Sequence, residues 1–230
     1  MMRPYYRDGL VTLYLADCCD LPHWLEADVL VTDPPYGIGG ELCRDGSFDH
    51  ARMEGNDGPE LRDAALALWG ERPALVFGSW RVPRPAATRM VLTWEKGEHV
   101  AMGDTALPWK PNTDEIYVLG SGFHGPRTSS VLHCLALGGF VGYAANGTRR
   151  HPTEKPVGLM RELIAKCPAG ATADPFAGVG TTLIAAKQLG RRAVGVEVRA
   201  DYCEAAARRL SQLTIFEAGA ELAEAGGITP

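Results

Sequence analysis

Apolar residues along this chain fall into short runs of the kind that form buried strands. These runs alternate with longer amphipathic stretches that have helical spacing. The predicted strands cover residues 10–16, 27–32, 74–78, 89–93, 115–119, 172–174 and 192–198, and the predicted helices cover residues 60–69, 157–167, 181–189 and 201–213. Alternation of apolar strands with helices is typical of a parallel sheet that is covered on both faces. The pattern therefore predicts an α/β fold.

The length of 230 residues suits one α/β domain, which we predict to cover residues 1–216. Residues 217–230 contain Glu217, Glu221 and Glu224 but no Lys or Arg, and we expect them to form an acidic, disordered tail. The formal net charge of −5 argues against a protein that coats nucleic acid without specificity. A local basic face remains compatible with this charge.

The sequence carries no recognisable signal for a membrane span, for secretion or for a metal site. No apolar run approaches the roughly 20 residues that a membrane span requires. The first eight residues lack the apolar segment of a secretory signal. The six cysteines form no Cys-x-x-Cys pair and have no nearby His at zinc spacing. These patterns predict a cytoplasmic protein with reduced thiols, no metal site and no membrane partner.

The tetrapeptide Asp33-Pro34-Pro35-Tyr36 directly follows a predicted strand, so it would lie where open α/β sheets bind their ligands. Two consecutive prolines make the loop rigid and leave carbonyl oxygens beside a carboxylate. An aromatic amine is a poor nucleophile because its lone pair is delocalised into the ring. The Asp33 carboxylate and the Pro34 carbonyl would hold its two hydrogens and localise that lone pair for attack on a methyl sulfonium. Tyr36 offers a flat face to a base turned out of its stack.

The same four residues would also suit a Pro-rich turn with a capping Asp, so a second signal is needed. Residues 174–182 supply it, because they join a strand to a helix and contain Gly178 and Gly180, which let the backbone approach a ligand. Glu197 ends the next strand, at about the 20-residue spacing expected of an acid that binds ribose hydroxyls.

A dinucleotide site is the competing interpretation of this glycine loop. It requires Gly or Ala at position 183, where the chain has Leu183. No Lys follows Gly180, which excludes the phosphate-binding loop of nucleotide hydrolases. A nucleoside ligand without a pyrophosphate fits better, with Asp174 near its ammonium group and Glu197 on its ribose.

Residues 151–156 read His-Pro-Thr-Glu-Lys-Pro and precede the helix predicted at 157–167. Thr153 and Glu154 would suit a solvated turn that caps this helix. Lys155 would not, because a cation at a helix start opposes the helix dipole. We therefore expect a carboxylate, such as that of a ligand, beside Lys155.

Together, these three motifs and Glu197, with Tyr202 and the helix after it, resemble, in type and order, the amino-group DNA methyltransferases of the beta arrangement. The middle section is similar to small adenine methylases of phages and prophages in its segments Trp94-Glu95-Lys96, Gly103-Asp104, Trp109-Lys110-Pro111 and Gly122-Phe123-His124-Gly125. The resemblance spans most of the chain. It implies a three-layer, Rossmann-like methyltransferase fold, with a mostly parallel sheet of seven strands, one of them antiparallel, and a circularly permuted motif order. It also implies S-adenosyl-L-methionine as the cofactor, double-stranded DNA as the partner, and a role in DNA modification or restriction–modification.

The resemblance also assigns roles to residues. The catalytic residues would be Asp33, Pro34, Pro35 and Tyr36, with Asp33 bonded to the target amine and Tyr36 stacked on the flipped base. The cofactor-binding residues would be Asp17, Thr153, Lys155, Asp174, Phe176, Gly178, Gly180, Thr181 and Glu197. Thr153 and Lys155 would lie near the methionine end of the cofactor and Asp17 near its adenine, although Asp17 would almost equally suit a helix cap.

Recognition of the DNA sequence has less support. The segment available for it is a small insertion roughly within residues 97–147, so a homodimer or another partner would supply further contacts. Arg81, Arg84, Arg89, Lys96 and Arg127 are candidate DNA contacts, but the sequence does not indicate that they converge.

Several activities remain as alternatives at this point. Adenine is favoured over the amine of cytosine because enzymes of the latter kind more often carry Ser at position 33. Methylation of a protein glutamine usually goes with Asn there, and carbon methylation of cytosine needs a Pro-Cys dipeptide that this chain lacks. A catalytically silent, cofactor-binding subunit is disfavoured because all four residues of the loop at 33–36 are present.

Overall fold

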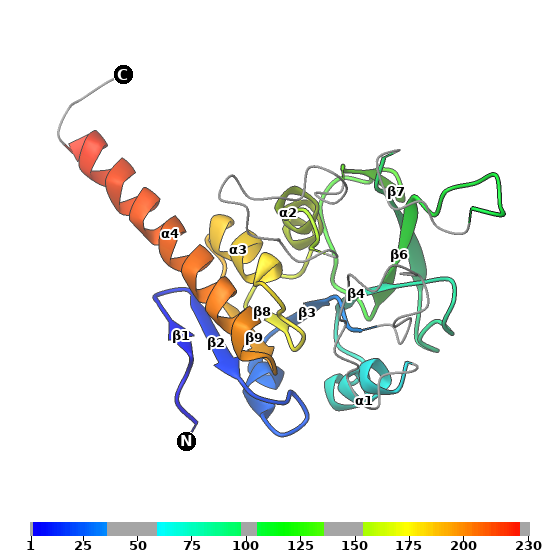
Figure 1. The fold of residues 1–230 in the computed structure, drawn as a ribbon, viewed down its shortest axis with the longest axis horizontal. Coiled ribbons are helices and arrows are strands. Elements are labelled where there is room, and N and C mark those ends of the chain that lie inside the picture. Colours follow the sequence, from blue (N-terminus) through cyan, green and yellow to red (C-terminus); the bar gives the residue numbers. More distant parts are fainter. Residues whose placement is uncertain (1, 36–58, 98–104, 136–153, 226–230) are drawn as a thin grey trace.

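The computed structural model describes residues 2–35, 59–97, 105–135 and 154–225, without the side chains of residues 213–225 (Figure 1). The strands are β1 (Tyr6–Arg7), β2 (Val11–Leu15), β3 (Val29–Thr32), β4 (Ala74–Gly78), β5 (Met90–Glu95), β6 (Thr113–Leu119), β7 (Val131–His133), β8 (Thr172–Asp174) and β9 (Ala193–Glu197). The helices are the 3-10 helix η1 (Pro22–Glu26), α1 (Glu60–Trp69), α2 (Val157–Ala165), α3 (Thr181–Gln188) and α4 (Ala200–Ala225).

In the described part of the chain, the nine strands form one mixed sheet in the order β1-β2-β9-β8-β3-β4-β6-β5-β7. The five strands from β2 to β4 in this order are mutually parallel. Strand β6 is antiparallel to both of its neighbours, β4 and β5. The run from β2 to β5 thus confirms the predicted seven-stranded sheet with one antiparallel strand.

Two short edge strands were not predicted. Strand β1 has two residues and pairs antiparallel to β2, and β7 has three residues and pairs parallel to β5. Runs of this length carry too few residues for a recognisable alternation of apolar and polar positions. Their pairing with a neighbouring strand, rather than their own pattern, defines them.

Two apolar clusters cover the two faces of the sheet. On one face, side chains such as Val31 and Phe77 pack against α2, α3 and α4, with Leu163, Leu183 and Leu210 buried there. On the other face, Leu30 and Val76 pack against η1 and α1, where Trp24 and Trp69 stack 5.8 Å apart. Because successive side chains of a strand point to opposite faces, an apolar run supplies both layers. The three-layer architecture is confirmed (Figure 1).

The circular permutation is visible in the sheet order. Strand β2 near the start of the chain pairs in parallel with β9, the last strand, with Leu13 opposite Gly195. The chain therefore enters and leaves the sheet at neighbouring positions. Beyond β9, α4 continues away from the sheet (Figure 1).

Helix α4 is longer than the sequence pattern predicts. We expected it to cover residues 201–213, but it runs for 26 residues to Ala225. The segment after 213 is rich in Ala and Glu, which have high helix propensity and continue a helix without needing an apolar face. Residues 217–225 of the predicted acidic, disordered tail are thus helical, which corrects that expectation for them, and residues 226–230 lie outside the described residues.

The predicted recognition segment is also partly core. Strand β6 lies within residues 97–147 and pairs with β4 and β5 along its length. The segment is thereby reduced to the stretches on either side of β6, of which residues 98–104 and 136–147 lie outside the described residues. Their role in recognition stays a prediction.

Across the described residues, no helix is both long and apolar enough to cross a membrane.

Candidate active site

The predicted motifs follow four neighbouring strands of the sheet. Asp17 comes two residues after β2, Glu197 ends β9, Asp174 ends β8 and Asp33 follows β3. These strands are adjacent and parallel, so their carboxyl ends meet at one edge. Residues that are far apart in the sequence are thereby brought together, at the edge where open α/β sheets bind ligands.

Asp174 is buried at the end of β8, with 2% of its surface exposed. Its Oδ1 accepts hydrogen bonds from Thr32 Oγ1 at 2.7 Å and from the Phe176 amide at 3.1 Å. Burial raises its pKa to about 6, against hydrogen bonds from Thr182, Thr32 and Phe176 that lower it. The bond from Thr32 ties the strand that leads into Asp33 directly to the strand that leads into the glycine loop.

Glu197 anchors the glycine loop from the neighbouring strand. Its Oε2 accepts a hydrogen bond from the Gly178 amide at 2.8 Å, and its Oε1 accepts one from the Arg199 amide at 2.8 Å. Burial raises the pKa of this carboxyl. Both carboxylate oxygens therefore accept hydrogen bonds from backbone amides, and the one from Gly178 ties the end of β9 to the glycine loop.

The two glycines of the loop have positive φ but different surroundings. Gly180 caps α3 at φ 81°, and a Cβ there would lie 2.9 Å from the Cβ of Ala206 in α4. Gly178 has φ 52°, and a Cβ there would meet nothing within 4 Å. Gly180 thus lets two helices approach each other, whereas Gly178 borders open space.

Leu183, which argued against a dinucleotide site, is completely buried in α3. The close approach of helix and sheet is provided by Gly195 in β9, because a Cβ at that position would lie 2.7 Å from Leu183 Cδ1. The small residue that a dinucleotide fingerprint places on the helix is here on the strand.

Lys155 meets a carboxylate, as expected, but the carboxylate belongs to the protein. Its Nζ donates to Asp33 Oδ2 at 2.5 Å, and the side chains of Lys155 and Asp33 are 7% and 24% exposed. The ammonium also lies 5.0 Å from the ring centroid of Phe77 and 5.9 Å from that of Trp94. This contact therefore joins the third motif to the segment that follows β3.

The other predicted site residues are placed as follows. Pro34 is buried and Pro35 is half-buried, beside Asp33. Phe176 is half-buried and Thr181 is buried at the start of α3. Asp17 is exposed, and its Oδ1 accepts a hydrogen bond from the Cys19 amide at 2.8 Å, so it stabilises a turn. Tyr36 and Thr153 lie outside the described residues.

An ion pair that the sequence analysis missed links the third motif to the glycine loop. Arg209 of α4 donates to Glu154 Oε1 at 2.6 Å and to the Val179 carbonyl at 2.6 Å. The Glu154 side chain is 6% exposed. No local pattern signals this contact, because its partners are 55 and 30 residues apart in the sequence.

The candidate DNA contacts divide between the two edges of the sheet. Arg81 and Arg84 follow the carboxyl end of β4, and Lys96 follows that of β5, so these three lie at the edge of Asp33. Arg89 precedes β5, and Arg127 lies between the end of the antiparallel β6 and the start of β7, which puts both at the opposite edge.

Comparisons with known proteins agree with this architecture. The sequence model of a DNA methylase family matches residues 108–208. The Type II methyltransferase M.ScaI of Streptomyces caespitosus is 40% identical over 255 residues, covering 90% of this chain and 84% of that protein.

Solved structures share the fold at lower identity. The cytosine-N4-specific PvuII DNA methyltransferase has a TM-score of 0.67 at 14% identity, over 90% of this chain and 88% of that one. A complex of M1.HpyAVI with S-adenosylmethionine has a TM-score of 0.57 at 21% identity, over 87% of this chain and all of that one. With the motif order, the sheet order and the match to M.ScaI in agreement, the chain belongs to the N6/N4 family of DNA methylases, which transfer a methyl group from S-adenosylmethionine to an exocyclic amine of a DNA base.

Proposed function

We propose that the chain methylates the exocyclic amine of adenine in double-stranded DNA, with Asp33 as the main acceptor for the amine hydrogens. The observation that carries this proposal is the placement of Asp33 beside Asp174, on adjacent parallel strands that the Thr32–Asp174 bond ties together. The segment proposed to hold the base and the loop proposed to hold the cofactor are thus tied to each other. Fixed orientation of two reactants is the main source of rate in a direct transfer.

The glycine loop fits a nucleoside cofactor. Open space borders Gly178, where a side chain would otherwise stand, and buried carboxyl groups lie on both sides of the loop at Asp174 and Glu197. We propose that Gly178, Gly180, Phe176 and Thr181 line the cofactor, with Glu197 and Asp17 towards its ribose and adenine and Asp174 and Thr153 towards its methionine end. When bound, the cofactor supplies the electrophilic methyl group.

The residues of the catalytic loop would prepare the amine. Asp33 Oδ and the Pro34 carbonyl oxygen would accept hydrogen bonds from its two N–H groups, which favours a pyramidal nitrogen with a localised lone pair. The rigidity of two consecutive prolines keeps these acceptors in place. Tyr36 would stack on the flipped base. The proton that the methylated amine must lose can pass to the Asp33 carboxylate, which is 24% exposed and can return it to water.

Adenine is proposed over cytosine because position 33 holds Asp rather than Ser. A second copy of the chain is proposed as an additional source of DNA contacts, because only short stretches flanking β6 are available for recognition. Nucleoside mass spectrometry of DNA modified in a methylation-free host tests the base. N6-methyladenine is expected, and N4-methylcytosine would overturn the choice of adenine while leaving the amine chemistry intact.

The Asp33→Ala variant tests the role of the carboxylate with labelled cofactor and unmethylated DNA. We expect transfer to fall by at least about 100-fold, because the variant loses an interaction made with the reacting amine, while calorimetric affinity for S-adenosylmethionine stays near that of the wild type. Glu71→Ala, at an exposed position after α1, is the control. An Asp33→Ala variant with ordinary turnover would remove Asp33 from the chemistry.

A further inference from the structure

The buried ammonium of Lys155 is the feature at this edge that neither the cofactor loop nor the amine chemistry explains. Its Nζ lies 2.5 Å from Asp33 Oδ2. Below it, the rings of Phe77 and Trp94 pack edge to face, with centroids 6.3 Å apart at 88°. These rings belong to β4 and β5, so the ammonium lies against aromatic side chains from two strands of the sheet.

Charge explains why a cation is needed at this position. Asp33 and the buried Asp174 end neighbouring strands, and the negative charge of Asp33 contributes to the raised pKa of Asp174. Two carboxyl groups in one site oppose each other's ionisation, whereas an ammonium in contact with one of them favours its charged form. A charge-assisted bond also fixes the orientation of the carboxylate.

The segment that carries Lys155 is itself anchored. Arg209 of α4 binds Glu154, the preceding residue, and the Val179 carbonyl of the glycine loop. Three contacts of 2.6 Å or less connect the glycine loop to Asp33. They join the Val179 carbonyl to Arg209, Arg209 to Glu154, and Lys155, the residue after Glu154, to Asp33. The positions of the cofactor loop and of the catalytic carboxylate are therefore set by the same few residues.

We propose that Lys155 is a positioning residue for Asp33, which it holds as an oriented carboxylate, and that Glu154 and Arg209 keep Lys155 in register with the glycine loop. Lys155 thereby orients the proposed acceptor of the amine hydrogens and does not bind the cofactor, in contrast to the role implied by the resemblance. The inference rests on the proposed role of Asp33 as the acceptor of the amine hydrogens.

The Lys155→Met variant removes the charge and keeps most of the length of the side chain. We expect kcat to fall by at least about tenfold, while the calorimetric Kd for S-adenosylmethionine changes by no more than about twofold. Lys155→Arg, which keeps a cation beside Asp33, should recover a large part of this kcat, and Lys166→Met is the control for loss of a lysine elsewhere.

Three outcomes would overturn the inference. Lys155→Met with weakened cofactor affinity and a wild-type kcat at saturating cofactor would make Lys155 a cofactor contact. A Lys155→Met variant with unchanged kcat and unchanged Kd would show that Lys155 has no role in the reaction. If Lys155→Met does not fold, the Glu154→Gln variant tests the proposal instead, because it weakens the bond that anchors the same segment. We expect this variant to have a lower kcat and an unchanged Kd, and a wild-type kcat would overturn the proposal. An active Asp33→Ala variant would instead refute the proposed role of Asp33, so the two failures are distinguishable.

Discussion

At the scale of single residues, Asp33 and Asp174 are two carboxyl groups with opposite surroundings. Asp33 is partly exposed and contacts an ammonium, whereas Asp174 is buried and accepts hydrogen bonds from neutral donors. Removal from water disfavours a charge unless a counter-charge accompanies it. We infer a division of roles, in which Asp33 faces the base and Asp174 provides a titratable group behind the cofactor loop.

The raised pKa of Asp174 predicts a pH effect on the cofactor. Because the group titrates at about 6 in the folded protein, lowering the pH through 6 neutralises it and should weaken binding of the cationic ammonium of S-adenosylmethionine. Between the ordinary value of 3.8 and about 6, the folded state binds this proton more tightly than the unfolded state, so this group makes the cofactor-free protein more stable as the pH falls.

Calorimetric titration of the cofactor between pH 5 and 8 measures the first effect. In Asp174→Asn, which cannot titrate, we expect lower affinity at pH 8 and a flat profile through pH 6. A wild-type profile that is equally flat would contradict a role for Asp174 in binding.

At the scale of elements, the loop between β8 and α3 combines two requirements in one short sequence. Gly178 leaves space for a ligand, while Gly180 permits the contact between the start of α3 and Ala206 in α4. Arg209 then adds a hydrogen bond from α4 to the carbonyl between the two glycines. Helix α4 is consequently part of the support of the loop as well as a cover of the sheet.

Substitution of the two glycines should separate these requirements. Both substitutions force Ala into positive φ, which costs roughly 1–2 kcal/mol. Gly180→Ala adds a contact of 2.9 Å with Ala206, so we expect a larger loss, on the order of 3 kcal/mol in total. Gly178→Ala should lose only the conformational part but should weaken cofactor binding more, because its methyl group enters open space beside the loop.

Urea unfolding and calorimetry on both variants measure this difference. Each variant is the control for the other, since both carry the same chemical change within one loop. Equal losses of stability and equal losses of affinity would show that the two glycines are not specialised.

At the scale of the whole molecule, the order and direction of the strands bring exposed aromatic and cationic side chains to the edge of Asp33. Trp80, which is 71% exposed, and Arg81, whose guanidinium lies 5.4 Å from the Trp80 ring centroid, follow the strand next to β3. Trp109, 77% exposed, precedes the antiparallel β6 and so lies at the same edge. Exposed aromatic and cationic side chains together are a suitable surface for nucleic acid.

Arg81→Ala is expected to weaken DNA binding several-fold and to lower the slope of log K against log salt concentration by about one, as for loss of a phosphate contact. Arg127→Ala, an exposed arginine at the opposite edge, is the matched control and should change neither quantity. Fluorescence anisotropy with duplex DNA at several salt concentrations measures both. A stronger effect at Arg127 would place DNA on the other edge.

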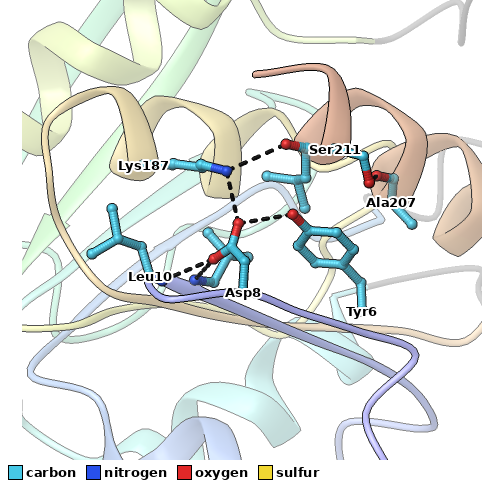
Figure 2. A network of polar contacts seen from close by, with 8 residues as sticks. Tyr6, Asp8, Leu10, Lys187, Ala207 and Ser211 are labelled. Atoms are coloured by element: carbon cyan, nitrogen blue, oxygen red, sulfur yellow. Dashed lines mark hydrogen bonds and ion pairs between the residues drawn. The ribbon is translucent and has the colours of Figure 1, made fainter. Parts of the chain in front are cut away.

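A second feature of the whole molecule joins the two ends of the permuted chain (Figure 2). Lys187 at the end of α3 donates to Asp8 Oδ2 at 2.7 Å and to the Leu210 carbonyl at 3.3 Å. Asp8 also accepts hydrogen bonds from Tyr6 Oη and from the amides of Leu10 and Val11. Burial acts to raise the pKa of Asp8, but these bonds outweigh it and lower the pKa to about 2.

Breaking this network should destabilise the fold. Asp8→Asn removes the negative charge beside the ammonium of Lys187, whose side chain is 3% exposed, and we expect a cost of about 3 kcal/mol. Since the folded pKa of Asp8 is depressed, its contribution is complete above about 3.8 and is lost as the pH falls towards 2. Urea unfolding at pH 7 and at pH 3 measures both effects.

Arg208→Gln is the control, because it breaks the exposed pair with Glu204 and should cost less than about 1 kcal/mol. An equal cost in the two variants would show that burial of the Lys187–Asp8 pair is unimportant.

The sequence by itself determined most of the elements, the order of the motifs and the class of fold, but not the short edge strands β1 and β7 or the full length of α4. Helix α1, strand β4 and strand β8 were predicted with the bounds that the structure has, because apolar periodicity is a local property of the backbone. The motifs at residues 33–36 and 174–182 were recognisable for the same reason, since each is one continuous segment that follows a strand.

Only the tertiary structure decided which side chains meet. Lys155 contacts Asp33 across 122 residues, and Thr32 contacts Asp174 across 142. The sequence predicted a carboxylate for Lys155 but not its identity, because the partner depends on which strands are neighbours in the sheet. The cations divide between two edges for the same reason: strand direction is a property of the assembled sheet, and local hydrophobic pattern carries no information about it.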